Sequence, residues 1–231
     1  MPETPELIDT ARRLWAGAFR GVLSTHSASH PGYPFGSVAP YCLDQDALPL
    51  LLLSHLAQHS KNLAADPRCG LLLTGSGADD VQQQARLSVI ADCEPLAAEQ
   101  RAAAECYFRC FPQTRPYFEQ LNFRFFRLRP RTLHLNAGFA SARWLGPERV
   151  VTPNPFDPET ESRLIGEVSA RQTELRRLFG GAVGDADIAV AGIDGYGMDL
   201  RLGEWLRRVP FPRPVSSHQQ VSELIPTLTA A

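Results

Sequence analysis

The run Leu48–Leu53 (LPLLLL) constrains the fold more than any other segment of the chain. Its side chains are apolar at nearly every position, so a strand formed by them has no face that suits contact with water. The run is also far shorter than the roughly 20 residues that a bilayer crossing requires. It therefore predicts a short strand buried deep inside a domain.

Further short segments before and after this run have strand character, with turn residues between them. The predicted strands are Gly21–Thr25, Phe35–Cys42, Cys69–Thr74, Ala85–Cys93, Phe123–Leu128 and Thr132–Leu135. The predicted helices among them are Glu6–Phe19, Gln58–Ala65 and Pro95–Cys110. Many short strands with a turn about every 8–12 residues indicate a barrel rather than a parallel sheet.

A change of composition marks a second unit. The segment Val151–Pro158 (VTPNPFDP) contains three prolines, which is typical of a linker. We expect a barrel domain over residues 1–149, a linker over 150–158 and a small α+β domain over 159–231. The predicted elements of the small domain are a helix over Glu159–Phe179, strands over Ile188–Ile193 and Met198–Leu202, and a last helix from Ser217 to about Pro226.

The charge pattern argues against two classes of partner. The formal net charge is −2, and acidic and basic residues are interspersed without a long basic face. Nucleic acid and anionic membranes are therefore not expected as partners. The first residues, MPETPELIDTARRL, lack the apolar core of a signal peptide. With five cysteines and no Cys-x-x-Cys pair, we expect reduced thiols and a cytoplasmic location.

The segment Ser54–Asn62 (SHLAQHSKN) is the best candidate for chemistry. It joins the buried strand to a short helix, and a helix N-terminus offers free N–H groups and a favourable dipole to an anion. The donors around it are the side chains of Ser54, His59, Ser60, Lys61 and Asn62, which suit a phosphate. The alternative is that Ser54 or Ser60 caps the helix and the rest is solvated surface.

Other patterns in the chain have simpler explanations than a functional site. His55 and His59 are four residues apart, but His55 precedes the helix and no third ligand is near, so no metal site is predicted. The Gly75–Gly77 triplet (GSG) leads into Ala-Asp-Asp and fits a hairpin turn better than a nucleotide loop. Cys106 and Cys110 are explained more simply as core thiols of one helix than as a redox pair.

The order of these elements resembles the pyridoxamine 5′-phosphate oxidase-like FMN-binding split barrels. The resemblance rests on the phrases PFGSVAPYCLD, LLLLSHLAQHSKNLAADPRCGLLL and QARLSVIADCEPL. In that family a lysine binds the flavin phosphate eight residues before the proline of an Asn-Pro-Arg stretch, and this chain has His59 there. An arginine binds the same phosphate at the start of the strand that lines the flavin ring, and this chain has Ser37 there.

The resemblance implies an α+β fold, in which a split β-barrel is followed by a small C-terminal α+β domain. It implies FMN bound at the interface of a homodimer, with Ser37–Tyr41 along the flavin ring. The residues implied in cofactor binding are Ser37, Val38, Ala39, Pro40, Ser54, His59, Ser60, Asn62 and Arg86. The cations that can compensate for the missing phosphate ligands are Lys61, Arg68 and Arg86. Trp144 is expected to pack against the linker or to cover the cofactor from the partner subunit.

A closer resemblance, over nearly the whole chain, is to the haem-utilisation HugZ/HutZ branch of the same fold. It rests on PGYPFGSVAPYCLD, SHLAQHSKNLAADPRC, AGFASARWL and GIDGYGMDLRLGEWLRRVPFPRP. Members carry a His-Met-Asn-x-Asp-His motif in the helix after the linker, and a tail histidine is tied to haem ligation. The matching stretch here is Glu167–Gln172 (EVSARQ), without either histidine, and His218 is the only histidine of the second domain. Haem iron needs a strong axial donor, so this difference favours flavin over haem.

These observations predict an FMN-dependent oxidoreductase related to pyridoxamine 5′-phosphate oxidase. No side chain stands out as an acid, base or nucleophile, and hydride transfer to a flavin requires none because the cofactor performs the chemistry. Two alternatives stay open. One is a haem-binding or haem-degrading protein of the HugZ/HutZ type, and the other is a non-catalytic dimer whose cofactor site has decayed.

Overall fold

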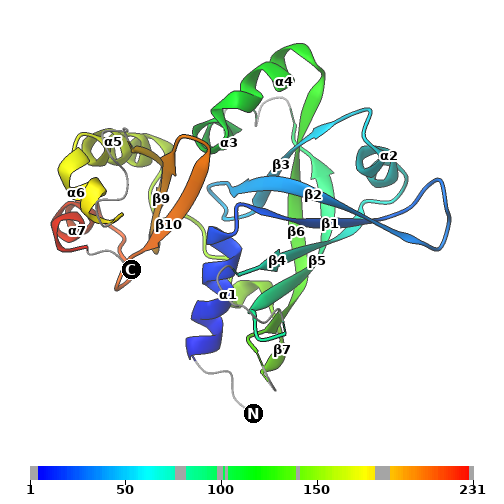
Figure 1. Cartoon of the computed structure of the whole chain (residues 1–231), viewed down its shortest axis with the longest axis horizontal. Helices are drawn as coiled ribbons and strands as arrows, with labels where there is room; N and C mark the ends of the chain where they lie inside the picture. The colour runs from blue at the N-terminus through cyan, green and yellow to red at the C-terminus, as the bar shows by residue number, and fades with distance from the viewer. Residues whose placement is uncertain are drawn as a thin grey trace. The chain divides into compact units, whose positions relative to one another are not determined.

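The computed structural model describes residues 5–75, 82–97, 101, 104–138, 141–179 and 188–228 (Figure 1). Contacts divide the chain into two units. The first consists of Met1–Tyr107 and Gln113–Thr152, and the second of Phe108–Pro112 and Pro153–Ala231. Val150 belongs to the core of the first unit, so the barrel extends into the segment predicted as the linker.

Seven strands of the first unit form one antiparallel sheet in the order β3-β2-β1-β4-β5-β6-β7 (Figure 1). The strands are β1 (Arg20–His26), β2 (Pro34–Leu43), β3 (Pro49–Ser54), β4 (Arg68–Thr74), β5 (Arg86–Pro95), β6 (Phe123–Asn136) and β7 (Ala142–Leu145). Because β3 also pairs with β6, six strands close into a barrel and β7 extends the sheet beyond β6. The predicted barrel is confirmed.

The leucine run occupies the strand that closes the barrel. Leu50–Leu53 are all buried, and β3 pairs with β2 on one side and with β6 on the other. Both faces and both edges of this strand are therefore covered by protein. The expectation of a deeply buried strand is confirmed.

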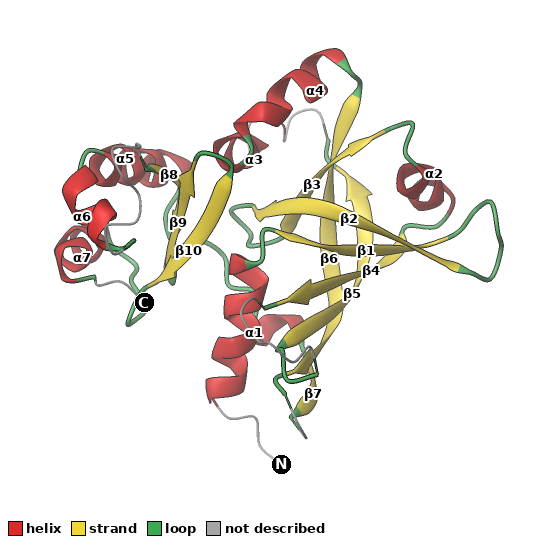
Figure 2. Cartoon of the chain, in the orientation of Figure 1, coloured by secondary structure: helices red, strands yellow, loops and turns green. Residues whose placement is uncertain are grey.

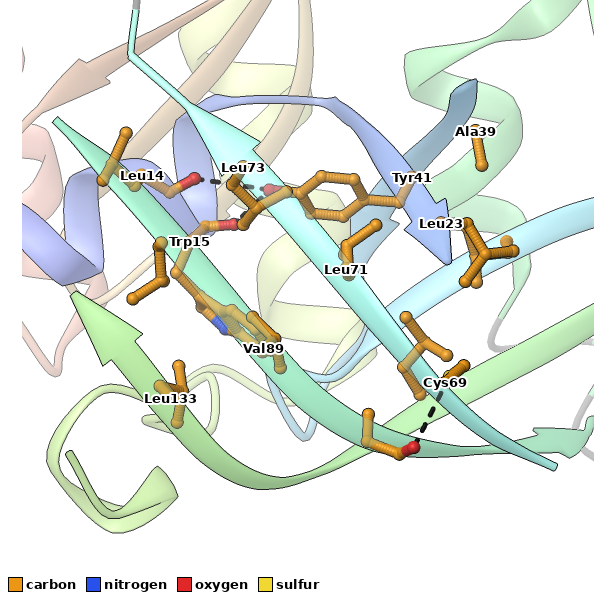
Figure 3. Close-up of a cluster of buried hydrophobic side chains, with 14 of the residues drawn as sticks. Leu14, Trp15, Leu23, Ala39, Tyr41, Cys69, Leu71, Leu73, Val89 and Leu133 are labelled. Carbon is orange, nitrogen blue, oxygen red and sulfur yellow. Dashed lines mark hydrogen bonds between the residues drawn. The ribbon is translucent and has the colours of Figure 1, made fainter. Parts of the chain in front are cut away.

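Helix α1 (Pro5–Gly17) contributes part of the barrel core through Ala11, Leu14 and Trp15. The indole Nε1 of Trp15 donates to the carbonyl of Ala47 at 3.0 Å. The hydroxyl of Tyr41 on β2 donates to the carbonyl of Trp15 at 2.6 Å (Figure 3). These two bonds connect the helix to the polypeptide around β2, so that both polar atoms are paired inside an apolar core.

The remaining helices before β6 are short. They are α2 (Gln58–Ala65), α3 (Glu105–Cys110) and α4 (Arg115–Gln120). Helix α3 begins in the first unit and ends in the second. The prediction that a helix begins at Pro95 is wrong, because β5 continues to Pro95 and the N–H of Leu96 still bonds to the carbonyl of Phe125. Residues 98–100 and 102–103 of that predicted helix lie outside the described part.

Strand β6 is continuous, although its two halves were predicted as separate strands. Pro130 lies inside it, opposite Ala91, and the register shifts between Ile90 and Ala91. A proline cannot donate to the strand ladder, and a β-bulge is where a sheet tolerates it. The proline therefore marks a bulge here and not the end of a strand.

The second unit has a three-stranded antiparallel sheet in the order β10-β9-β8 (Figure 2). Its strands are β8 (Ala189–Asp194), β9 (Gly197–Leu202) and β10 (Trp205–Pro210), and its helices are α5 (Pro158–Ser169), α6 (Gln172–Arg177) and α7 (His218–Leu224). Leu164, Leu175 and Val221, one from each helix, pack with Met198 and Leu200 of β9 in one core. In the residues that the structure describes, no helix has the length and apolar character of a membrane span.

The long helix predicted over Glu159–Phe179 is two helices. Arg171 has a non-helical backbone between them, with φ −91° and ψ 51°. The side chain of Gln172 donates to the carbonyls of Ser169 and Ile188, at 2.8 and 2.9 Å, and accepts from the N–H of Ile188. A side chain that bonds to the backbone in this way competes with helix continuation, and the resulting bonds tie the break to the start of β8.

A buried ion cluster joins the strands of the second unit. Arg208 of β10 donates to both carboxylate oxygens of Asp194 at 2.6 and 2.7 Å, and to Asp199 of β9 at 2.8 Å. Its side chain is only 10% exposed. Burial raises the pKa of Asp199 to about 6, even though the charge of Arg208 acts in the opposite direction. The cluster therefore depends on the positive charge of Arg208, which balances the negative charges of two carboxylates that have little contact with water.

Removing this arginine should destabilise the protein strongly. Arg208→Met leaves Asp194 and Asp199 without their partner, which costs about 3–5 kcal/mol for a buried pair. The measurement is the free energy of unfolding from chemical denaturation followed by circular dichroism. Arg213→Met, at an exposed position beyond the sheet, is the matched control and should change stability by about 0.5 kcal/mol or less. A small loss for Arg208→Met would contradict the role assigned to the cluster.

Candidate functional site

The candidate phosphate segment begins where β3 ends. A turn follows Ser54, and α2 starts at Gln58 with Ala57 as its N-cap, which makes no side-chain cap hydrogen bond. The hydroxyl of Ser54 instead accepts from the N–H of Leu56 at 3.3 Å. Neither Ser54 nor Ser60 caps the helix, so the capping alternative is wrong. The N–H of Ser60 already donates to the carbonyl of Ala57 at 3.1 Å, so the N–H groups of Gln58 and His59, the first two of α2, are those that can bind an anion.

The structure brings Ser37 of β2 next to His59 of α2. The hydroxyl oxygen of Ser37 lies 3.1 Å from Nδ1 of His59. The other ring nitrogen, Nε2, and the hydroxyl of Ser60 are both buried and have no hydrogen-bond partner in the described structure. Two buried polar atoms without partners are costly, and such groups commonly meet a ligand or water.

The cluster formed by Ser37, His59 and Ser60 carries little charge. Burial lowers the pKa of His59, so its imidazole is neutral at neutral pH. Lys61, the next cation on α2, is exposed. Arg68 is held by Asp66, with 2.6 Å between its guanidinium and the carboxylate. The cluster can therefore hold an anion through neutral donors and the helix terminus, with Lys61 as the cation nearest to it in the sequence.

Asn62 is placed differently from the other members of the segment. It is fully buried, and its amide donates to the hydroxyl of Thr25 at 2.9 Å. Its carbonyl oxygen accepts from the N–H of Ala28 at 2.9 Å and from the side chain of Gln58 at 2.8 Å. Asn62 thus fastens α2 to the end of β1, and its amide is already engaged by Thr25, Ala28 and its own helix neighbour Gln58.

The predicted ring-lining residues lie on two faces of β2. Ser37 and Ala39 point to the inside of the barrel, whereas Val38 and Pro40 point outward, as alternation along a strand requires. Arg86 is on β5, three strands away from β2 in the sheet order, next to the fully buried Leu87 and therefore on the outer face. The fold of the chain does not bring Arg86 to Ser37 and His59.

The outer face carries a row of side chains that sequence reasoning did not find as a unit. Strand registers place Val38, Val22, Leu72, Ser88, His134 and Trp144 opposite one another in successive strands. We call these six residues the outer row. Val38 is 70% and Trp144 60% exposed, and the rings of His134 and Trp144 lie 4.8 Å apart. Alternation along each strand could have predicted that these side chains face outward. Only the register of the strand pairs shows that they stand opposite one another.

The remaining sequence candidates do not form a site. His55 is exposed, and its Nδ1 lies 3.2 Å from the carbonyl oxygen of Asn122. No group of three or more metal-ligating side chains occurs among the described residues. The residues that follow Gly75 in the GSG triplet lie outside the described part of the chain.

A closed antiparallel barrel with a strand-to-helix segment of this kind defines a class. It is the split β-barrel of the pyridoxamine 5′-phosphate oxidase-like superfamily, with an α+β fold. The family model of the CREG β-barrel matches residues 2–150, so the chain belongs to the CREG β-barrel family. The predicted superfamily is therefore confirmed.

Individual relatives connect this fold to haem proteins. The chain is 29% identical over 135 residues to the non-canonical heme oxygenase HOZ, a chloroplastic protein of Arabidopsis thaliana. That match spans 58% of this chain and 41% of the relative, so less than half of HOZ is represented. The predicted resemblance to haem-related members of the superfamily is borne out.

Two solved structures show the same fold over nearly the whole chain. The protein Atu2129 of Agrobacterium tumefaciens, of unknown function, has a TM-score of 0.79 at 20% identity, with 99% of this chain and 98% of that chain covered. A heme binding protein of Mycobacterium smegmatis has a TM-score of 0.59 at 24% identity, with 97% and 96% covered. At these identities the likeness shows the fold alone.

The structural role of Asn62 can be separated from a ligand role by substitution. Asn62→Ala leaves the N–H of Ala28 without its partner and removes one of the two bonds of the Thr25 hydroxyl, which still donates to the carbonyl of Phe35. This should cost about 1–3 kcal/mol of stability. The measurement is thermal and chemical unfolding of the protein without added cofactor. Lys61→Ala, at the exposed neighbouring position, should leave stability nearly unchanged. Equal stability of the two variants would refute the anchoring role.

Proposed function

We propose that this chain is an FMN-dependent oxidoreductase that works as a homodimer, with the cofactor at the interface between subunits. The observation that carries the proposal is the pair of buried atoms without partners, Nε2 of His59 and the hydroxyl of Ser60, at an uncapped helix start. A phosphate oxygen would complete the hydrogen bonding of both atoms. The resemblance to FMN-binding split barrels supports the same ligand.

The phosphate would be held chiefly by His59, Ser60 and the first N–H groups of α2. Ser54 begins the same turn, and Ser37 orients the imidazole through its contact with Nδ1. Because the arginine and lysine of the oxidases are absent, neutral donors do most of the work, and Lys61 supplies the nearest charge along α2. We therefore expect weaker FMN binding than a site with two cations would give.

The flavin ring would lie along β2, with side-chain contacts from Val38 and Pro40 on the outer face and a backbone contact at Ala39. Val38 and Pro40 are exposed on the outer face, and a second copy of the chain seated on the outer row would cover them. Arg86 and Trp144 lie on the same outer face, so in such a dimer they would be at the interface with the partner subunit. When bound, FMN would supply hydride and electron transfer, and the protein would position it against a small-molecule substrate.

The phosphate contact of His59 can be tested with two ligands that differ only in the phosphate. His59→Ala removes one donor to a charged group, so FMN affinity should fall about 10- to 150-fold, equivalent to 1.5–3 kcal/mol. Riboflavin affinity should stay the same because riboflavin has no phosphate. The measurement is flavin fluorescence titration of the two ligands.

The matched control for this test is His55→Ala. His55 is exposed in the turn before α2, so its loss should leave FMN affinity unchanged. If His59→Ala binds FMN as tightly as the unaltered protein, or weakens riboflavin equally, the phosphate role is disproved.

The dimer can be tested on the outer row. Val38→Glu places a charge where the partner would bury it, which should weaken association at least about tenfold. Leu56→Glu is the matched control, because Leu56 is 69% exposed, close to the 70% of Val38, but lies in the turn before α2. Sedimentation velocity over a concentration series measures the change. A monomeric unaltered protein, or equal behaviour of both variants, would contradict the proposed interface.

Haem binding is the second candidate function, favoured by the similarity to a non-canonical heme oxygenase of Arabidopsis thaliana and to a heme binding protein of Mycobacterium smegmatis. His218, the one histidine of the second unit, has Nε2 2.8 Å from the carboxylate of Glu167, so Nδ1 is its remaining ring nitrogen. Titration with haem should give a sharp Soret band if this candidate is correct, and His218→Ala should alter it if that residue is the axial ligand. Binding of neither ligand would favour a decayed cofactor site.

A further inference from the structure

Two cysteines distant in sequence have their sulfurs in contact. Sγ of Cys42, near the end of β2, lies 3.7 Å from Sγ of Cys106 in α3. Cys42 is buried and Cys106 is partly exposed. A disulfide has an S–S length of about 2.05 Å, so the two atoms need to approach by less than 2 Å. Rotation about the side-chain bonds can produce movements of that size.

The other cysteines of the chain provide an internal comparison. Cys69 and Cys93 also interact, but both are buried in the barrel. A hydrogen bond with Cys69, together with burial, raises the pKa of the Cys93 thiol. Cys110 is buried as well. Since the thiolate is the form that reacts, and access is required, these three thiols are expected to be inert.

We propose that Cys42 and Cys106 form a peroxide-sensitive dithiol that closes to an intramolecular disulfide. The thiolate of Cys106 attacks hydrogen peroxide, the O–O bond breaks, and the sulfur becomes a sulfenic acid with release of hydroxide, which takes the proton lost by the thiol to form water. The Cys42 sulfur then attacks the sulfenic sulfur, an S–S bond forms, and a second water leaves. Two thiols are thus oxidised and one peroxide is reduced to two waters.

The position of the pair gives the disulfide a structural effect. The bond would join the start of α3 to the end of β2, and the loop that it closes contains β3, α2, β4 and β5. Closing a loop of this length lowers the entropy of the unfolded chain and stabilises the folded one. The crosslink would also enclose the segment of His59 and Ser60. The proposal does not depend on FMN binding, because it concerns only these thiols.

The experiment uses the full chain, reduced and then exposed to hydrogen peroxide. Alkylation after denaturation should find three free thiols where the reduced protein has five, because two are consumed. Mass spectrometry of a non-reduced digest should find the peptides of Cys42 and Cys106 linked. The Tm should rise by at least about 5 °C and return to its starting value with dithiothreitol.

Two variants distinguish this linkage from nonspecific oxidation. Cys106→Ser, at the partly exposed position, should abolish both the linked peptide and the rise in Tm. Cys69→Ala should keep both effects, although its starting stability can be lower. A dominant link between Cys106 and Cys110, equal oxidation of all five thiols, or an unchanged Tm in fully linked protein would overturn the proposal.

Discussion

The double pairing of β3 is the constraint on which the first unit depends. With β2 on one edge and β6 on the other, this leucine strand closes the antiparallel sheet into a barrel. Closure leaves β3 without a free edge and puts its side chains in the core on both faces. It also fixes where β3 ends, because Ser54 is the last residue paired with β6. The candidate site begins at that point, so its location follows from the barrel closure.

The chemistry of the site follows from what surrounds the start of α2. Anchoring by Asn62 holds the helix against β1, and the contact with Ser37 holds the imidazole of His59 against β2. The result is a small group of neutral donors fixed by the barrel rather than a charged pocket. Such a group recognises the shape and hydrogen bonding of an anion more than its charge. In the proposed FMN site, these neutral donors would take the place of the arginine and lysine of the oxidases.

The sequence predicted the parts of this structure that depend on local pattern. The buried strand, the barrel and the segment around His59 could be found because apolar runs and turn residues encode them directly. β7, β10 and α4 were missed, since four to six residues carry little periodicity. The burial of Asn62 depends on where β1 ends in three dimensions. The alignment of Val38 with Trp144 passes through five strand pairings, and no single segment encodes such a register.

The late position of β6 has a consequence for synthesis on the ribosome. The leucines of β3 pair with residues around Phe125, which are translated only after α2, β4 and β5. At roughly 5–20 residues per second, one edge of a nearly pure leucine strand waits several seconds for its partner. During that time the nascent chain displays an apolar, aggregation-prone segment. The feature that protects the finished barrel is therefore the one that makes its synthesis vulnerable.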